Sequence, residues 1–491
     1  MIISHKVRLL AVVSPLVLGG CVTAQETAGY SALDAGFTTV SAKASEATKK
    51  QTVWIQNQQQ AENVSKRVHG MIHKKTINAD TAVQVALLNN KGLQAAYADI
   101  GMNAAEVWQQ MLPENPRVSI GVLGIGTPGL SAWRAIEGII AANILSLATR
   151  DSRVDIADTR FRQAQLKAAM ATLTLAAETR RAWINSVSAF ETVYYLNQAQ
   201  TAADAASELA KKLGETGAFG KGGQAREHAF YSELTGQKAE ARLAAKLAKE
   251  ELTRLMGIWG SEVDYFVPDQ LPQLPSKLQT KNAIEREALQ KRVDLQIAKL
   301  ELEAIAKSYK LTDATRYVTD FEIIGGFEKE RELNEDGDIE KLTTKQVEFE
   351  FVIPIFDTGK PRLRKAELSY MQAANLLAEK AVNIRSEARS AYTGYRSTYD
   401  IARHYKNSVL PLRIKIEEEA LLTYNGMISN TFELLADTRA KIGTLMLSVN
   451  AKREFWLADA NLNTAIYGGG AGAGGGEGGG MALAEGGGSP H

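Results

Sequence analysis

The sequence predicts a mainly α-helical protein that also contains four β-strands. Three observations support this fold class: one plan occurs twice, about 200 residues apart; two helical stretches run for about 60 residues; and four segments have strand-like patterning. The chain has 491 residues, 45% of them hydrophobic, which is ample for a packed core. Lys+Arg and Asp+Glu number 57 and 56, so no global field attracts nucleic acid.

The N-terminus has the composition of a secretory signal. Lys6 and Arg8 precede an apolar run from Leu9 to Leu18, followed by Gly19 and Gly20. A helix that spans a membrane needs about 20 apolar residues, so this run is too short for one. We expect residues 1–20 to be a signal peptide.

Cys21 is the only cysteine of the chain. "LGGC" (Leu18 to Cys21) resembles the processing box of bacterial lipoproteins, which implies that Cys21 carries lipid and begins the mature chain. The absence of Asp after it, with Val22 at that position, implies the outer membrane. The alternative is an ordinary cleaved signal with an incidental cysteine. The remaining chain would hold no disulfide and no thiolate metal site.

No later segment has 18 consecutive apolar residues, so helical membrane spans are excluded. An exported chain that reaches the outer membrane therefore either sits on it through lipid or crosses it with β-strands.

The internal repeat is the strongest organisational signal. "AVQVALLNNKGLQAAYADIGMNAA" (Ala82 to Ala105) matches "IEREALQKRVDLQIAKLELEAIAK" (Ile284 to Lys307). Each half then reads helix, strand, strand, long helix, turn, helix.

The long helices are predicted near Arg153–Leu213 and Arg362–Tyr424, each roughly 90 to 95 Å long. The shorter helices of the first half, near Ala79–Met111 and Gln224–Met256, sum to nearly the same length. We therefore expect two short helices, stacked end to end, to lie antiparallel to one long helix.

The second long helix contains a seam with an average step close to 3.5 residues, the coiled-coil period. Pro411 should interrupt this helix, and the seam tyrosines need partners that accommodate a ring. The seam comprises Met371, Ala374, Ala378, Ala381, Ile384, Ala388, Ala391, Tyr395, Tyr399, Ala402, Tyr405, Val409, Leu412 and Ile416.

The four strand-like segments have about the length of a transmembrane β-strand, which is roughly 9 to 11 residues. In the last of them Val347, Phe349 and Phe351 alternate with polar neighbours, as in a water-filled barrel. Four strands cannot close a barrel, and an open edge in lipid is prohibitive, so membrane strands would require oligomerisation. The segments are Arg117–Ile125, Glu137–Leu147, Tyr317–Glu328 and Lys345–Phe356.

From about Thr81 to Ile466 this plan resembles the TolC-like outer-membrane efflux family. The resemblance rests on the duplicated helices, on "FVIPIFDTGKPRLRKAELSYMQA" (Phe351 to Ala373) and on "YNGMISNTFELLADTR" (Tyr424 to Arg439). It implies a homotrimer whose strands pool into a 12-stranded transmembrane β-barrel, continued by an α-helical barrel across the periplasm. The implied partners are an inner-membrane pump and a periplasmic adaptor; no cofactor is implied.

The expected organisation follows from the repeat and the resemblance. The segments are a signal peptide at 1–20, an N-terminal tether and equatorial segment at 21–75, a first repeat at 76–257, a linker at 258–280, a second repeat at 281–466 and a disordered glycine-rich tail at 467–491. Residues 22–45 are expected to be weakly structured.

Two glycines, Gly217 and Gly426, fall at matching turns between helices, where glycine can adopt φ > 0. The resemblance implies that these turns form the periplasmic mouth and contact the adaptor. Phe219, Asn425 and Ile428 are the other contact candidates. Simple helix-hairpin glycines are the alternative interpretation.

The gate candidates follow the second turn. Many family members carry two aspartates where this chain has Phe432 and Leu435, with Glu433 and Asp437 nearby. The gate is therefore either acidic or a hydrophobic constriction that closes by dewetting.

Several other patterns suggest chemistry without supporting it. "GIGTPG" (Gly124 to Gly129) precedes a strand instead of a helix, and "DTGKPR" (Asp357 to Arg362) lacks the first glycine of a phosphate loop. His69 and His73, with Met71 between them, have metal-ligand spacing but no third ligand, so exposed surface residues are favoured. The charged segment from Phe327 to Lys341 is expected to be a solvated external loop. No catalytic constellation emerges, so the protein is not expected to be an enzyme.

The sequence thus favours a passive trimeric exit duct for substrates delivered by a pump and adaptor, with heavy metal, copper or drug as cargo. The alternatives are a type I secretion duct and a lipid-anchored periplasmic coiled-coil scaffold with no channel.

Overall fold

The computed structural model of the chain describes residues 24–128, 130, 133–217, 220–280, 283–333, 338–426 and 431–470. The chain packs as two compact units, each assembled from three stretches. Unit 1 comprises Met1–Thr38, Ala98–Gln165 and Gln296–Glu379, and unit 2 comprises Thr39–Tyr97, Leu166–Leu295 and Lys380–His491. Both repeats contribute to both units.

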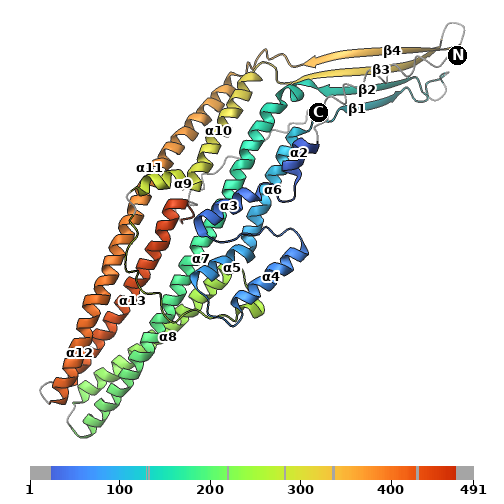
Figure 1. Cartoon of the computed structure of the whole chain (residues 1–491). Coiled ribbons are helices and arrows are strands. Elements are labelled where there is room, and N and C mark those ends of the chain that lie inside the picture. The colour runs from blue at the N-terminus through green and yellow to red at the C-terminus, as the bar shows by residue number, and fades with distance from the viewer. Residues whose placement is uncertain are drawn as a thin grey trace. The chain divides into compact units, whose positions relative to one another are not determined.

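The order of elements repeats as the sequence predicts (Figure 1). The first half contains α5 (Ala79–Asn89), α6 (Lys91–Met111), β1 (Arg117–Leu123), β2 (Ala135–Asn143), α7 (Ile144–Glu215) and α8 (Lys221–Met256). The second contains α9 (Ile284–Lys291), α10 (Val293–Ala314), β3 (Phe321–Leu333), β4 (Ile339–Phe351), α11 (Lys360–His404), α12 (Leu410–Asn425) and α13 (Thr431–Tyr467). Helices α2 (Ala24–Ser31), α3 (Phe37–Thr48) and α4 (Gln58–Ile72) precede the first half.

The helix that leads into each pair of strands is broken where the sequence predicts continuity. Asn90 separates α5 from α6 and Arg292 separates α9 from α10, with ψ of 123° and 120° respectively. The Asn90 side chain donates to the carbonyl of Leu255 at 3.0 Å and accepts the N–H of Leu93 at 3.0 Å. Side-chain bonds thus replace the helical ones at this break.

Helix α7 begins earlier than expected and continues for 72 residues. The Asn143 side chain accepts the N–H of Ser146 at 2.8 Å, which caps the new helix directly after β2. The strand predicted up to Leu147 therefore ends at Asn143.

The seam of the second long helix is confirmed in its centre. Tyr395 and Tyr399 are buried and pack on Phe455 of α13, with ring centroids 5.6 and 5.5 Å apart. Toward the two ends Met371 and Leu412 are 51% and 60% exposed, because no segment in the described ranges covers them. A π-helix at Tyr405–Val409 interrupts the helix just before Pro411, and α12 starts at Leu410.

The expectation that residues 22–45 are weakly structured is wrong for the described part. Helices α2 and α3 cover most of it, and in unit 1 Tyr30 donates to Asp158 of α7 at 2.8 Å. The Tyr30 ring also meets Phe161 edge-on at 5.5 Å. A ring and a hydroxyl together hold this segment on α7.

The core of unit 2 gathers around α5, α7 and α8. Trp183 donates its indole N–H to the carbonyl of Ile77 at 3.0 Å, and Tyr97 shares a buried hydrogen bond with Thr172 at 3.0 Å. The largest fully buried side chains of unit 2 are Ile72, Ile77, Leu87, Leu88, Tyr97, Leu234, Leu252, Met256, Tyr265, Ile384 and Phe455.

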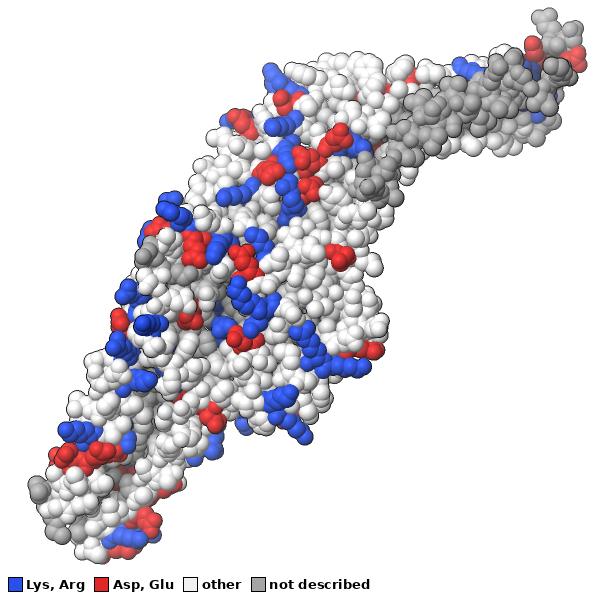
Figure 2. Space-filling model, viewed as in Figure 1, with Lys and Arg blue, Asp and Glu red and all other residues white. Residues whose placement is uncertain are grey.

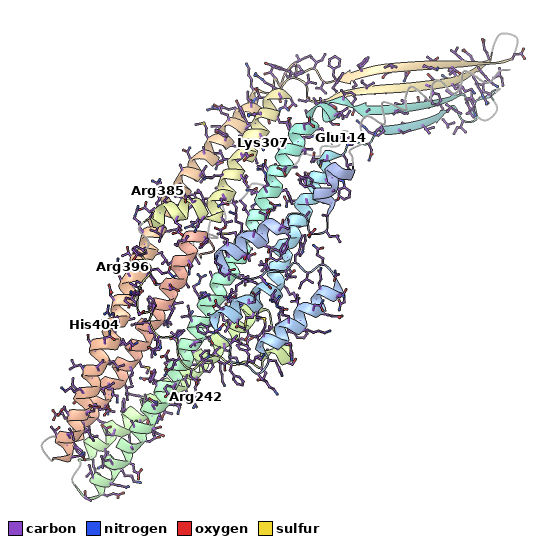
Figure 3. The ribbon with its side chains drawn as sticks, viewed as in Figure 1. Glu114, Arg242, Lys307, Arg385, Arg396 and His404 are labelled. Atoms are coloured by element: carbon purple, nitrogen blue, oxygen red, sulfur yellow. The ribbon has the colours of Figure 1, made fainter. Side chains whose placement is uncertain are left out.

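On the face that Figure 2 shows, charges of both signs are interspersed over the helices instead of gathered in one large patch of a single sign. Lys307 of α10, labelled in Figure 3, pairs with Asp155 of α7 and with Glu303, each at 2.8 Å. Among the described helices, none has a stretch apolar and long enough for a membrane span.

Candidate functional site

The four strands form one antiparallel sheet in the order β1-β2-β3-β4 (Figure 1). Pairing is continuous from Arg117 opposite Ala141, through Asn143 opposite Glu322, to Phe321 opposite Phe351. Residues directly opposite each other in such a ladder share one face of the sheet. The register therefore assigns every strand residue to one of two faces.

One face, called here the apolar face, carries no acidic residue within the described strands. Ile120, Val347 and Phe349 are 75%, 69% and 62% exposed on it. Its apolar residues are Val118, Ile120, Val122, Ile136, Ile140, Ala142, Phe321, Ile323, Phe327, Ile339, Val347, Phe349 and Phe351. Side chains that would normally form a core are thus presented outward.

The opposite face, called here the acidic face, carries eight glutamates. These are Glu137, Glu322, Glu328, Glu330, Glu332, Glu340, Glu348 and Glu350. Arg117 is the only basic residue on this face of the described strands, and it pairs with Glu322. Asn143 adds a hydrogen bond to Asp320 at 3.2 Å, where the sheet meets the helices.

The outer edges of β1 and β4 bond no other strand in the described part of the chain. All of β4 is exposed along its 13 residues. An edge of this length offers a row of unpaired backbone groups to another copy.

The turns between helices lie in unit 2. Gly217 has φ of 76°, as expected, and its N–H donates to the carbonyl of Gly214 at 3.1 Å. Gly426 has φ of −78°, so the expected positive φ is absent there, and its N–H bonds the carbonyl of Leu422. Asn425 is exposed at the end of α12. Phe219 and Ile428 lie outside the described residues.

The gate candidates lie in the first two turns of α13. Glu433 is exposed and Asp437 is half-buried. The backbone of Phe432 and Leu435 is helical, but their side chains lie outside what the structure describes.

Sequence reasoning missed the contacts that join α13 to α8 near these turns. Arg439 pairs with Glu227 at 2.8 Å, and its guanidinium lies over the Phe230 ring at 4.3 Å. The Glu227 side chain is 4% exposed. The signal available in the sequence was the charge of Glu227 at a helical position that becomes buried. Its partner, Arg439, is 212 residues away, so no local pattern pairs the two.

His69 and His73 stack with ring centroids 4.4 Å apart, and His69 pairs with Glu262 at 2.7 Å. Glu262 belongs to a 3-10 helix at Gly260–Val263 in the linker. No three metal-ligating side chains in the described ranges form a group that could hold a metal ion. Cys21 lies outside those ranges, as does the tail beyond residue 470.

Solved structures with the same arrangement of strands and long helices settle the fold. CusC, a transmembrane channel, matches with a TM-score of 0.65 at 16% identity, over 79% of this chain and 92% of that chain. The Campylobacter jejuni outer membrane channel CmeC matches with a TM-score of 0.66 at 18% sequence identity, over 80% of this chain and 86% of that chain. The outer-membrane channel OprN matches with a TM-score of 0.64 at 14% sequence identity, over 87% of this chain and 95% of that chain.

The chain has an outer-membrane channel fold. This confirms the long helices and the strands expected from the TolC-like resemblance. No family model matches the sequence, and no curated protein matches it. The channel fold is therefore visible in the structure, although the sequence identity to these channels is only 14–18%.

Proposed function

We propose that this chain is the outer-membrane duct of a tripartite efflux system, a passive trimer through which a pump and a periplasmic adaptor export their cargo. The observation that carries the proposal is the sorting of the sheet into an apolar face and an acidic face. A barrel wall needs that sorting, with lipid on one side and water on the other. A soluble sheet would bury its apolar face instead.

Three copies would supply the missing strands. Each copy brings four strands with two open edges, and lipid does not tolerate an open edge. Joining β4 of one copy to β1 of the next removes every edge and closes 12 strands, a size within the range of outer-membrane barrels. The similar channels support this arrangement through their fold.

Transport would depend on pore width, lining charge and opening at the helix turns. The turns around Gly217 and Gly426 are the proposed adaptor contacts, and the residues from Phe432 to Asp437 are the proposed gate. The glutamates of the acidic face would line the barrel.

A lipid on Cys21 would add a second attachment to the membrane. Mass spectrometry of the mature N-terminus tests this: an acylated Cys21 is expected, and an unmodified chain cleaved elsewhere would contradict it. A Cys21→Ser chain should lose the lipid but keep its strands.

The decisive experiment measures the mass of the purified chain in detergent and its conductance in planar bilayers. A conducting trimer is expected. Phe349→Arg on the apolar face should prevent insertion, because an arginine at mid-membrane costs about 2–4 kcal/mol per copy. Glu348→Arg, its neighbour on the acidic face, is the matched control and should still insert. A monomer that stays soluble without detergent and conducts nothing would favour the scaffold instead.

A further inference from the structure

The two faces of the β3–β4 hairpin also differ in the sign of their charge. From the row that pairs Phe327 with Lys345 to the end of the hairpin, all described acidic side chains of the two strands lie on the acidic face. The basic side chains lie on the other face. They are Lys329, Arg331, Lys341 and Lys345, and we call them the basic cluster.

The basic cluster continues the apolar face without a gap. Along β4 this face runs from Phe351 through Phe349 and Val347 to Lys345, Thr343 and Lys341, and it ends at Ile339. Val347, Phe349 and Phe351 are 69%, 62% and 56% exposed. The change from apolar to basic thus occurs within one step of the alternation, as at the boundary between lipid chains and headgroups.

The four cations crowd each other. Arg331 lies directly opposite Lys341, and Lys329 lies opposite Thr343, between Lys341 and Lys345. Opposite residues in such a ladder have Cβ atoms about 4.5–5.5 Å apart, and like charges at that spacing are destabilising. A shared anion would remove this repulsion.

Among the described residues, the three lysines of the basic cluster have no such counter-charge. No ion pair within the described ranges involves Lys329, Lys341 or Lys345, and Glu328, Glu330 and Glu340 point to the opposite face. Glu330 pairs there with Arg134 at 3.2 Å. The guanidinium of Arg331 lies 3.6 Å from the centroid of the Trp133 ring. An amphipathic ring beside a cation is typical of a membrane interface.

We propose that the basic cluster binds the phosphate groups of anionic lipids in the outer leaflet. This rests on the proposed function, because only a membrane-inserted barrel presents the apolar face to lipid. Lysine and arginine suit phosphate oxygens, and several cations on one rigid hairpin can hold a lipid that carries more than one phosphate. The source is a lipid, since the cluster borders the apolar face and acyl chains would follow that face.

The test uses the full chain reconstituted in phosphatidylcholine nanodiscs that contain diphosphoryl or monophosphoryl lipid A. The protein is then extracted in detergent, and the lipid A that it retains is measured by mass spectrometry. We expect more diphosphoryl than monophosphoryl lipid to be retained. The triple variant Lys329→Gln, Lys341→Gln, Lys345→Gln should lose retention on the order of a hundredfold, from about 1 kcal/mol per lysine near an anionic surface.

Two control variants separate charge from fold. Lys→Arg at the same three positions should keep retention. Lys246→Gln, Lys365→Gln and Lys415→Gln, on exposed helical surfaces, should leave it unchanged. Equal retention by the wild type and the Lys→Gln hairpin variant would overturn the proposal, and so would complete displacement by inorganic phosphate, which would indicate a free-phosphate site.

Conductance of the same samples distinguishes failure of this inference from failure of the proposed function. A chain that conducts in bilayers but retains no lipid A has a solvated basic cluster, and the lipid site is then wrong. A chain that neither inserts nor conducts contradicts the duct itself.

Discussion

Glu191 of α7 and Lys452 of α13 form an ion pair of 3.0 Å although 261 residues separate them. The Glu191 side chain is 3% exposed, and its second oxygen accepts the N–H of Leu271 at 2.9 Å. One buried carboxylate therefore joins a helix of each repeat to the linker between the repeats.

The first prediction concerns this pair. Glu191→Gln should lower the free energy of unfolding by about 3 kcal/mol, because Lys452, whose side chain is only 16% exposed, is left without its counter-charge. Thermal unfolding in detergent measures this change in the free energy of unfolding. The double variant Glu191→Gln, Lys452→Met should recover most of the loss, and an unchanged midpoint for the single variant would show that the pair contributes nothing.

A second prediction concerns the end of α13. Gly469 has φ of 89°, and a Cβ there would lie 2.7 Å from the carbonyl carbon of Leu173 and 2.8 Å from the nitrogen of Thr174. Backbone atoms cannot rotate away, so Gly469→Ala should cost about 2 kcal/mol.

Gly443, inside α13, is the matched control, because a Cβ there would meet nothing within 4 Å. Gly443→Ala should stabilise the chain by about 1 kcal/mol through helix propensity. The two substitutions should thus shift the unfolding midpoint in opposite directions; a shift of the same sign for both would contradict the packing at Gly469.

The third prediction is a pH dependence. Asp80, in the first turn of α5, pairs with Arg180 at 2.7 Å and Lys50 at 3.3 Å. Burial raises the pKa of its carboxyl, but the charges of Arg180 and Lys50 outweigh burial and lower the pKa below the ordinary 3.8. A depressed pKa means that the stabilisation is present above pH 3.8 and is lost as the pH falls through the folded-state pKa.

Hydrogen exchange of the amide of Gln51 measures this effect, because Gln51 follows Lys50 directly and its N–H donates to the side chain of Gln84 at 3.1 Å. Exchange, corrected for its intrinsic pH dependence, should speed up below pH 3.8 in the wild type. In Asp80→Asn it should be fast already at neutral pH and vary less with acid. The same acid profile in both chains would rule out Asp80 as the cause.

The fourth prediction concerns the contact between α8 and α13. Glu227→Gln should weaken the pair with Arg439 and speed hydrogen exchange at residues 225–235 and 431–442. Lys212→Gln is the control, because its pair with Glu208 has side chains 69% and 67% exposed and such pairs contribute little. Equal exchange in both variants would show that the Glu227–Arg439 pair does not hold the two helices together.

Much of the fold follows from local pattern. The alternation of Val347, Phe349 and Phe351 with glutamates predicts the faces of β4, and the 3.5-residue seam predicts the burial of Ile384, Ala388 and Tyr395. The breaks at Asn90 and Arg292 could not be predicted. Arg292 is buried because it forms two hydrogen bonds to Asp294, at 3.0 and 2.9 Å, and also pairs with Glu387 from α11.

The sequence by itself determined the duplicated plan, the two long helices and the four strands, because periodicity and capping act over a few neighbouring residues. Only the tertiary structure decided that Glu191 meets Lys452, that Glu262 reaches His69, and that basic and acidic side chains of one hairpin lie on opposite faces. These contacts join residues far apart along the chain or depend on strand register. These contacts stabilise the protein only after the chain has folded, so a local sequence pattern does not predict them.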